Sequence, residues 1–216
     1  MQVVLLGLPG AGKGTQAERI TAEFAVPHIS TGDMFRAAIA ADTELGREVK
    51  AYLDSGRLVS DELTIRVVQD RFLQPDAMRG FLLDGFPRTL PQAEALDATL
   101  QEMGRAIDAV LFIHVPQEVL LARLTGRRIC QSCGATYHLE FQPPQHEGIC
   151  DKCQGELYQR PDDTEEAVKM RLQQYAYTAP LVEFYRDRGL LRQVDGDRPI
   201  DEVYADVRRL LLEAQA

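Results

Sequence analysis

The residues from Gly7 to Thr15 (GLPGAGKGT) have the composition of a loop that binds phosphate groups. They follow a short apolar run at 2–6 and open a helical pattern at 13–24, the context that separates a phosphate-binding loop from a chance glycine cluster. The glycines let backbone N–H groups point at a polyphosphate, and the helix N-terminus adds positive potential. We expect the triphosphate of a nucleotide to contact Gly10, Ala11, Gly12, Lys13, Gly14 and Thr15.

The loop departs at one position from the general pattern, which has Ser or Thr directly after the lysine to contact magnesium. Gly14 occupies that position, and Thr15 follows one residue later. We expect Lys13 to reach the β- and γ-phosphates. The loop by itself indicates only a nucleoside triphosphate, because GTPases, motor proteins and kinases all use it.

All four cysteines lie in one short segment, as two Cys-x-x-Cys knuckles with 16 residues between them: Cys130, Cys133, Cys150 and Cys153. Glycines beside the knuckles allow the tight turns that aim four sulfurs at one point, so the spacing predicts a structural, tetrahedral zinc site. A redox pair and disulfides are the alternatives, and a reducing compartment disfavours the disulfides. Four thiolates complete a zinc shell, so we expect the nearby His138 and His146 to be surface residues.

Several motifs in combination resemble the adenylate kinase family. They are GLPGAGKGTQ at 7–16, STGDMFR at 30–36, DGFPRT at 84–89, Gly126-Arg127-Arg128 and RPDD at 160–163. With Val194-Asp195-Gly196 near the end, the resemblance covers essentially the whole chain, and the family's loop also has Gly-Thr after the lysine. Members transfer a phosphoryl group reversibly from MgATP to AMP, giving two ADP, and consist of a core, an AMP-binding insertion and a lid. The resemblance implies this activity in adenine-nucleotide homeostasis, and a monomer.

A reaction between two nucleotides concentrates negative charge, and the guanidinium group of arginine matches a phosphate with two parallel hydrogen bonds. By the family pattern, Arg36 and Arg88 bind the AMP phosphate, and Arg123 and Arg127 bind the donor phosphates. Arg160 and Arg171 approach AMP and the transferred group from the lid side. Surface pairing is the alternative for each arginine. The expected catalytic set is Lys13, Arg88, Arg123, Arg160 and Arg171.

No general base is expected, because the attacking oxygen belongs to a phosphate whose second pKa is about 6. Catalysis should rest on positioning and electrostatic stabilisation. Asp84 ends a buried run beside the loop and is the best carboxylate to order magnesium through its waters; pairing with Lys13 or Arg88 is its alternative role. Asp33, Asp162 and Asp163 are weaker magnesium candidates. Asp163, followed by Glu166, resembles a helix cap.

The resemblance also places the residues around the acceptor nucleotide. Thr31 and Gln92 fall where the family recognises AMP, and the Gln92 amide can exchange two hydrogen bonds with an adenine edge. Gly85 and the segment from Arg57 to Val59 line the same pocket. An exposed helical position is the alternative for Gln92. A UMP or CMP acceptor and a GTP donor remain open.

The segment 126–160 resembles the zinc-bearing lid of bacterial adenylate kinases. Zinc would stabilise a small element with little core of its own and would do no chemistry. The lid would exclude water, which otherwise accepts the phosphoryl group. Thr136 and Tyr137 are expected to contact the donor nucleotide, and Arg198 to lie beside the donor base.

The elements that must position these residues alternate between strands and helices. Continuous apolar runs predict buried strands at 2–6, 27–29, 81–83, 109–115 and 190–194. Helical patterns occupy 13–24, 61–73, 90–103, 117–124, 163–177, 180–188 and 199–214, with Pro199 as a first helical residue. The alternation predicts an α/β fold, a three-layer sandwich around a parallel five-stranded sheet.

Two stretches interrupt this alternation, a helix-helix stretch and the cysteine segment. We interpret both as insertions: the AMP-binding insertion at 30–59 and the zinc lid at 126–160. The core is then 1–29, 60–125 and 161–216.

The composition and charge limit the kinds of partner that the protein can bind. The chain has 216 residues, a formal charge of −9 and a pI near 5.0, which argues against a general nucleic-acid binder. No apolar run approaches the length of a membrane span, and the start lacks the features of a signal peptide, so a cytoplasmic protein is expected. The alternative function is a P-loop NTPase carrying a zinc-ribbon binding module. A P-loop switch or motor would leave the 30–36 and 84–89 motifs unexplained.

Overall fold

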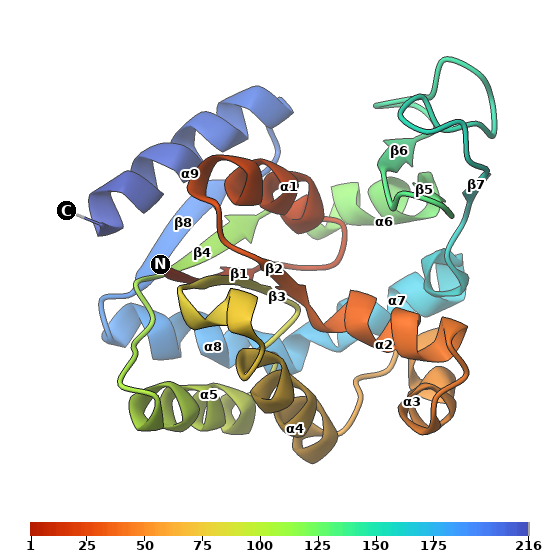
Figure 1. The fold of residues 1–216 in the computed structure, drawn as a ribbon. Coiled ribbons are helices and arrows are strands. Elements are labelled where there is room, and N and C mark those ends of the chain that lie inside the picture. Colours follow the sequence, from red (N-terminus) through yellow and green to blue (C-terminus); the bar gives the residue numbers. More distant parts are fainter. Residues whose placement is uncertain (216) are drawn as a thin grey trace.

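A five-stranded parallel sheet forms the centre of the computed structural model, which describes residues 1–215 (Figure 1). Its strands are β1 (Gln2–Leu6), β2 (His28–Ser30), β3 (Phe81–Asp84), β4 (Ala109–His114) and β8 (Leu191–Asp195). They lie in the order β2-β3-β1-β4-β8, and each neighbouring pair is parallel. The predicted fold class is therefore confirmed.

The helices and a second, smaller sheet complete the fold. The helices are α1 (Lys13–Phe24), α2 (Thr31–Ala40), α3 (Glu44–Asp54), α4 (Asp61–Phe72), α5 (Leu90–Glu102), α6 (Gln117–Thr125), α7 (Glu165–Gln173), α8 (Tyr175–Asp187) and α9 (Ile200–Ala214), with 3-10 turns η1 (Pro75–Met78) and η2 (Pro161–Asp163). The smaller, antiparallel sheet has the order β6-β5-β7, with β5 at Arg127–Cys130, β6 at Thr136–His138 and β7 at Leu157–Tyr158. No helix in residues 1–215 is long and apolar enough to cross a membrane.

Helices cover both faces of the central sheet because its strands are apolar on both sides (Figure 1). In β1, Val3 and Leu5 pack with α1 and α9, whereas Val4 and Leu6 pack with α4, α5 and α8. Side chains alternate between the faces of a strand, so four consecutive apolar residues supply two cores. This packing fixes β1 and the loop that follows it.

The order of the strands indicates which edge of the central sheet binds ligands. β1 lies between β3 and β4, and Leu5 pairs in register with Asp84. In open parallel sheets ligands bind outside the carboxyl ends of the strands, where the order reverses. The loops after β1 and β3 therefore emerge side by side.

Both interruptions of the strand-helix alternation are additions at this edge. In the chain, α2 and α3 come between β2 and α4, and the smaller sheet comes between α6 and η2. The Ser30 and Thr43 hydroxyls cap α2 and α3 by accepting hydrogen bonds from Asp33 N and Gly46 N. The smaller sheet has strands of two to four residues, too short for independent stability.

Several local predictions differ from the structure. The helix predicted at 163–177 is divided, since α7 ends at Gln173 and α8 begins at Tyr175. A helix beginning at Pro180 is wrong, since α8 begins at Tyr175 and contains Pro180 near its start. Proline at this position removes one helical hydrogen bond. The packing of Leu181 and Tyr185 in the core stabilises the helix by more than this loss. Pro199 caps α9 instead of forming its first residue. β2 begins one residue later than predicted, because the preceding proline cannot donate to the ladder.

Candidate active site

A cavity of about 870 Å³ opens at the carboxyl edge of the central sheet. Loops after β1 and β3, the α2–α3 addition and the smaller sheet all contribute to its wall. Every residue predicted to contact a nucleotide lines it: Gly10, Ala11, Gly12, Lys13, Gly14, Thr15, Thr31, Arg36, Arg57, Val59, Asp84, Gly85, Arg88, Gln92, Arg123, Arg127, Thr136, Tyr137, Arg160, Arg171 and Arg198. Residues from widely separated segments of the sequence thus share one space.

The loop after β1 turns into α1 at Gly12, whose φ of 91° lies in the left-handed region that favours glycine. The first turn of α1 points into the cavity without a side-chain cap, so its free N–H groups are available to an anion. Lys13 Nζ donates to the carbonyls of Gly7 at 2.9 Å and Leu8 at 3.2 Å. Burial lowers the pKa of Lys13 to about 8, although the charge of Asp84 opposes this shift.

Asp84 ends β3 and faces the same loop. Burial acts against its ionisation, but His28, whose Nε2 lies 3.4 Å from the carboxylate, and the charge of Lys13 lower the pKa of Asp84 below its ordinary value. Asp84 is therefore an anion at neutral pH. A single ionised carboxylate beside a phosphate loop suits magnesium, which binds proteins through one or two carboxylates and keeps its waters and substrate phosphates.

The loop after β3 brings Arg88 into the cavity. Its Nε donates to the carbonyl of Gly85 at 2.8 Å, and the Thr31 hydroxyl donates to the same carbonyl at 3.0 Å. Gly85 has a φ of 80°, and a Cβ there would lie 2.8 Å from the Thr31 oxygen. Burial lowers the pKa of Arg88, but the guanidinium group stays charged at neutral pH.

Gln92 contributes to this loop from α5. Its side chain is only 2% exposed, so the alternative of an exposed helical residue is wrong. Its Oε1 accepts a hydrogen bond from Arg88 N at 2.8 Å, and its Nε2 donates to Asp61 at 2.7 Å. Adenine recognition by Gln92 stays a prediction, and its amide already orients Arg88.

The other arginines pair with carboxylates around the cavity. Asp33 on α2 accepts from Arg36 and lies 3.6 Å from Arg160. Arg123 donates to Asp197 at 2.9 Å. Charges from the α2–α3 addition, the end of the smaller sheet and the loop before α9 therefore meet at one site.

Asp163 is the centre of a second charged cluster and is fully buried. Both of its oxygens accept from Arg127, at 2.6 and 2.8 Å, and Arg171 donates to it at 3.0 Å. The prediction that Asp163 caps a helix is wrong: Thr164 caps α7 instead, because its hydroxyl accepts from Ala167 N. Pairing with two guanidinium groups offsets the cost of burying this carboxylate. In return, the carboxylate holds Arg127 and Arg171 at the cavity wall.

Two arginines near these clusters are strongly desolvated. Burial lowers the pKa of Arg160 and of Arg171 to about 10, with acidic neighbours acting in the opposite direction. Both remain charged at neutral pH, and phosphate oxygens would replace the water they have lost.

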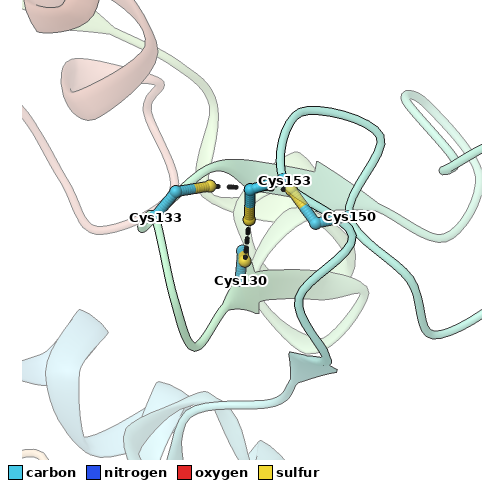
Figure 2. Close-up of side chains that lie close together, drawn as sticks. All are labelled: Cys130, Cys133, Cys150 and Cys153. Atoms are coloured by element: carbon cyan, nitrogen blue, oxygen red, sulfur yellow. Dashed lines mark hydrogen bonds between the residues drawn. The ribbon is translucent and has the colours of Figure 1, made fainter.

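The four cysteine side chains converge at the tip of the smaller sheet (Figure 2). Their sulfurs all lie within 4.8 Å of one another; Cys130 and Cys153 are 3.4 Å apart, and Cys133 and Cys150 are 3.6 Å apart. None is in a disulfide. This is the only such group of potential metal ligands in residues 1–215.

The electrostatics of the cluster favour a cation. The Tyr137 hydroxyl, which accepts from Asp151 N, donates to Cys150 and lowers the pKa of that thiol to about 6. At Cys153 the N–H of Gly155 also lowers the pKa of the thiol, but the neighbouring sulfurs outweigh this and raise the pKa to about 12. The four thiols therefore do not all ionise together without a positive ion nearby. Four sulfurs are the donor set of structural zinc.

The two histidines near the knuckles lie outside this sulfur cluster. His146 is exposed, as predicted. His138 is not a simple surface residue: its Nε2 lies 3.1 Å from the Ala122 carbonyl, and its ring stacks on Phe141 at 4.3 Å. Phe141 also lines the cavity.

The remaining predicted residues lie at the rim. Thr136 is exposed, and Arg198 donates to Asp206 on α9. Arg57 donates to Ser55 at 3.0 Å. Thr136, Arg198 and Arg57 all line the cavity.

Sequence reasoning missed several wall residues, among them Gln174, Tyr175 and Thr178 around the start of α8. They belong to no phosphate-binding motif, and only the fold brings them to the cavity. The sequence signal that could have found them is the helix boundary at Tyr175, which the prediction placed at Pro180.

Comparison with known proteins identifies the family. The adenylate kinase family profile matches residues 5–190. An adenylate kinase of Bacillus licheniformis is 58% identical over 212 residues, covering 98% of each chain. Adenylate kinases of a Geobacillus species and of Carboxydothermus hydrogenoformans are 58% and 57% identical over the same length, covering 98% of this chain and 98% and 99% of theirs. The chain belongs to the adenylate kinase family.

Proposed function

We propose that this chain transfers the γ-phosphoryl group of ATP reversibly to AMP, giving two ADP, and so maintains adenine-nucleotide balance. One observation carries the proposal: the helix-terminal loop with Lys13 and the loop with Arg88 leave adjacent, paired strands and line a single cavity. Two phosphate-binding elements in one cavity suit a reaction between two nucleotides. The full-length similarity to proteins named adenylate kinase supports the same function.

The donor and the acceptor would occupy opposite parts of the cavity. On the donor side, ATP would contact the loop 10–15, with Arg123, Arg127, Thr136, Tyr137 and Arg198 around it. On the acceptor side, AMP would contact Thr31, Arg36, Arg57, Val59, Gly85, Arg88 and Gln92. Arg160 and Arg171 would lie over the phosphates between them.

The chemistry would depend on charge and position rather than on a base. The attacking phosphate oxygen of AMP needs no deprotonation at neutral pH. Lys13, Arg88, Arg123, Arg160 and Arg171 would stabilise charge on the transferred group, and pairing with carboxylates pre-orients several of them before substrate binds. Bound magnesium would neutralise donor phosphate charge, with Asp84 accepting hydrogen bonds from its waters.

The segment 126–160 would act as a lid whose zinc, held by Cys130, Cys133, Cys150 and Cys153, is structural. The segment 30–59 would carry AMP, and the rest of the chain would form the core. Closure of the lid would exclude water from the γ-phosphate. We also propose a cytoplasmic monomer without nucleic-acid or membrane partners, supported by the −9 charge and by thiols that require a reducing compartment.

Nucleotide chromatography tests this function. The protein is mixed with MgATP and, in parallel, with AMP, CMP, UMP or GMP, with an ATP-only control. Two ADP formed for each ATP consumed, only with AMP, is the expected result. ADP formed equally in every tube would favour the NTPase alternative, and transfer only to CMP or UMP would overturn the acceptor assignment.

A further inference from the structure

Thr178 lies in the first part of α8 and lines the cavity, but no motif singles it out. Its hydroxyl donates to the backbone carbonyl of Arg88 at 3.1 Å, across 90 positions of sequence. Arg88 lies in the loop between β3 and α5. Thr178 therefore gives the backbone of this loop a hydrogen-bond partner on a helix that is distant in sequence.

This hydrogen bond differs from those of three other helical threonines, although Thr31 at the start of α2 also donates to this loop, at the carbonyl of Gly85. The hydroxyls of Thr64, Thr99 and Thr125 each donate to the carbonyl four residues earlier in the chain. That local bond is the usual choice for a threonine inside a helix. Thr178 instead donates to a loop of the active site, so its hydroxyl joins two parts of the fold.

The other contacts of Arg88 are local. Its backbone N–H donates to Gln92 and its Nε donates to Gly85, both within four residues. These bonds shape the loop after β3 and tie it to α5, but they leave its distance from α8 unspecified. Thr178 supplies that constraint.

The helix that carries Thr178 is a rigid support. Leu181 and Tyr185, one and two turns further along α8, are fully buried in the cluster that also contains Phe86 of the Arg88 loop. At its other end, α8 follows α7 after Gln174 alone, and α7 carries Arg171. Thr178 therefore lies between Arg88 and the helix of Arg171.

We propose that Thr178 is a positioning residue that holds Arg88 at a fixed place relative to Arg171. The two guanidinium groups then meet the same phosphate pocket in one arrangement. The inference rests on the proposed function, because it assigns both arginines to the acceptor and the transferred phosphoryl group. Thr178 itself touches no reacting atom.

The test compares Thr178→Val, which keeps the shape but removes the hydroxyl, with Thr178→Ser, which keeps the hydroxyl. Loss of one hydrogen bond that orients a catalytic charge should lower kcat/KM for AMP about tenfold. The KM for ATP and the melting temperature should hardly change, and Thr178→Ser should recover activity to within about twofold. Thr178→Ala replaces the valine variant if that variant does not fold.

Two controls separate positioning from a structural role. Thr21→Val removes a hydroxyl that donates to Glu18 O at 3.0 Å on α1 outside the cavity, and should leave the AMP parameters unchanged. In an Arg88→Ala background, Thr178→Val should have no further effect, because the positioned group is gone. Additive losses, equal losses for ATP and AMP, or no loss in Thr178→Val would overturn the inference.

Failure of the function itself has a different signature. Wild-type protein that transfers nothing to AMP would contradict the proposed function and this inference together. Normal transfer by the wild type, a large loss in Arg88→Ala and an unaffected Thr178→Val would contradict the inference alone.

Discussion

The two additions at the carboxyl edge of the sheet have different interiors. In the α2–α3 addition, Phe35, Val49 and Val59 pack with Leu63 of α4, each at most 7% exposed. In the smaller sheet, the buried cluster is Cys130, Ala135, Tyr137, Cys150 and Leu157. Two of the five members of the latter are potential metal ligands.

The difference shows two solutions to the same problem, which is stabilising a segment too small for a full core. Capped helices bury apolar side chains in one segment. In the other, short strands leave little apolar area, so we expect a bound metal ion to supply the missing free energy. The first segment should depend on packing and the second on metal.

Charged contacts join these segments to the rest. Arg160 at the start of η2 faces Asp33 of α2, and Lys152 in the second knuckle pairs with Glu18 of α1. Such contacts can form and break at little cost in free energy, which suits the proposed movement of the segment 126–160.

Cys150→Ser should have the largest effect. It removes one of the four proposed zinc ligands, and structural zinc contributes on the order of 10 kcal/mol to small metal-stabilised units. We expect lost zinc by metal analysis and rapid proteolysis within 126–160, while 30–59 stays protected. His146→Ala, at an exposed lid position, is the control. Full zinc content in Cys150→Ser would refute the four-sulfur site.

Val49→Ala should destabilise the other segment in a way that does not depend on zinc. Val49 is fully buried, and removing its two methyl groups should cost about 2 kcal/mol through lost burial and a cavity. Hydrogen exchange should speed up in 30–59 with the same magnitude in zinc-loaded and zinc-depleted protein. A zinc-dependent effect would show that the two segments are not independent.

A pH change acts on the core that both segments cover. Because the pKa of Lys13 is lowered to about 8, ATP affinity should fall about tenfold between pH 7 and pH 9 as the free protein loses this charge. The contribution of Lys13 to the unfolding free energy has the opposite sign: the unfolded chain binds more protons between pH 8 and 10.5, so stability rises there.

The pH effect is measured by titrating ATP into the protein across this range, with Lys13→Met as the comparison. The variant should bind weakly at every pH without the step near pH 8. An unchanged ATP affinity in the wild type up to pH 9.5 would contradict the lowered pKa.

Lys152→Ala should give the smallest effect. The Lys152–Glu18 pair is exposed, and such pairs contribute at most about 1 kcal/mol. Loss of this contact between lid and core should shift the lid toward open forms by up to about fivefold, measured with a donor–acceptor label pair. Lys169→Ala breaks a similarly exposed pair within α7 and should shift nothing. Equal shifts in both variants would exclude a specific contact.

Local sequence patterns predicted most of the fold. The glycine loop, the apolar strands and the cysteine knuckles each depend on residues close in sequence, and their types alone restrict the backbone or the ligand. The sheet and the convergence of the motif residues on one cavity followed from these elements.

Two of the wrong predictions concern residues whose partners or packing contacts are distant. Asp163 looked like a cap because Glu166 follows it, but Arg127, 36 positions earlier, holds it. Pro180 looked like a helix start, and the packing of Leu181 and Tyr185 overrode that local preference. The bond of Thr178 to Arg88 leaves no trace in either local sequence.

The most direct test of the account measures ADP formation with and without AMP, in zinc-loaded and zinc-depleted protein. The account predicts that zinc-loaded protein forms ADP only with AMP, and that zinc removal lowers the ratio of transfer to ATP hydrolysis. A zinc-loaded protein that hydrolyses ATP equally fast without AMP, or an unchanged ratio after verified zinc removal, would contradict it.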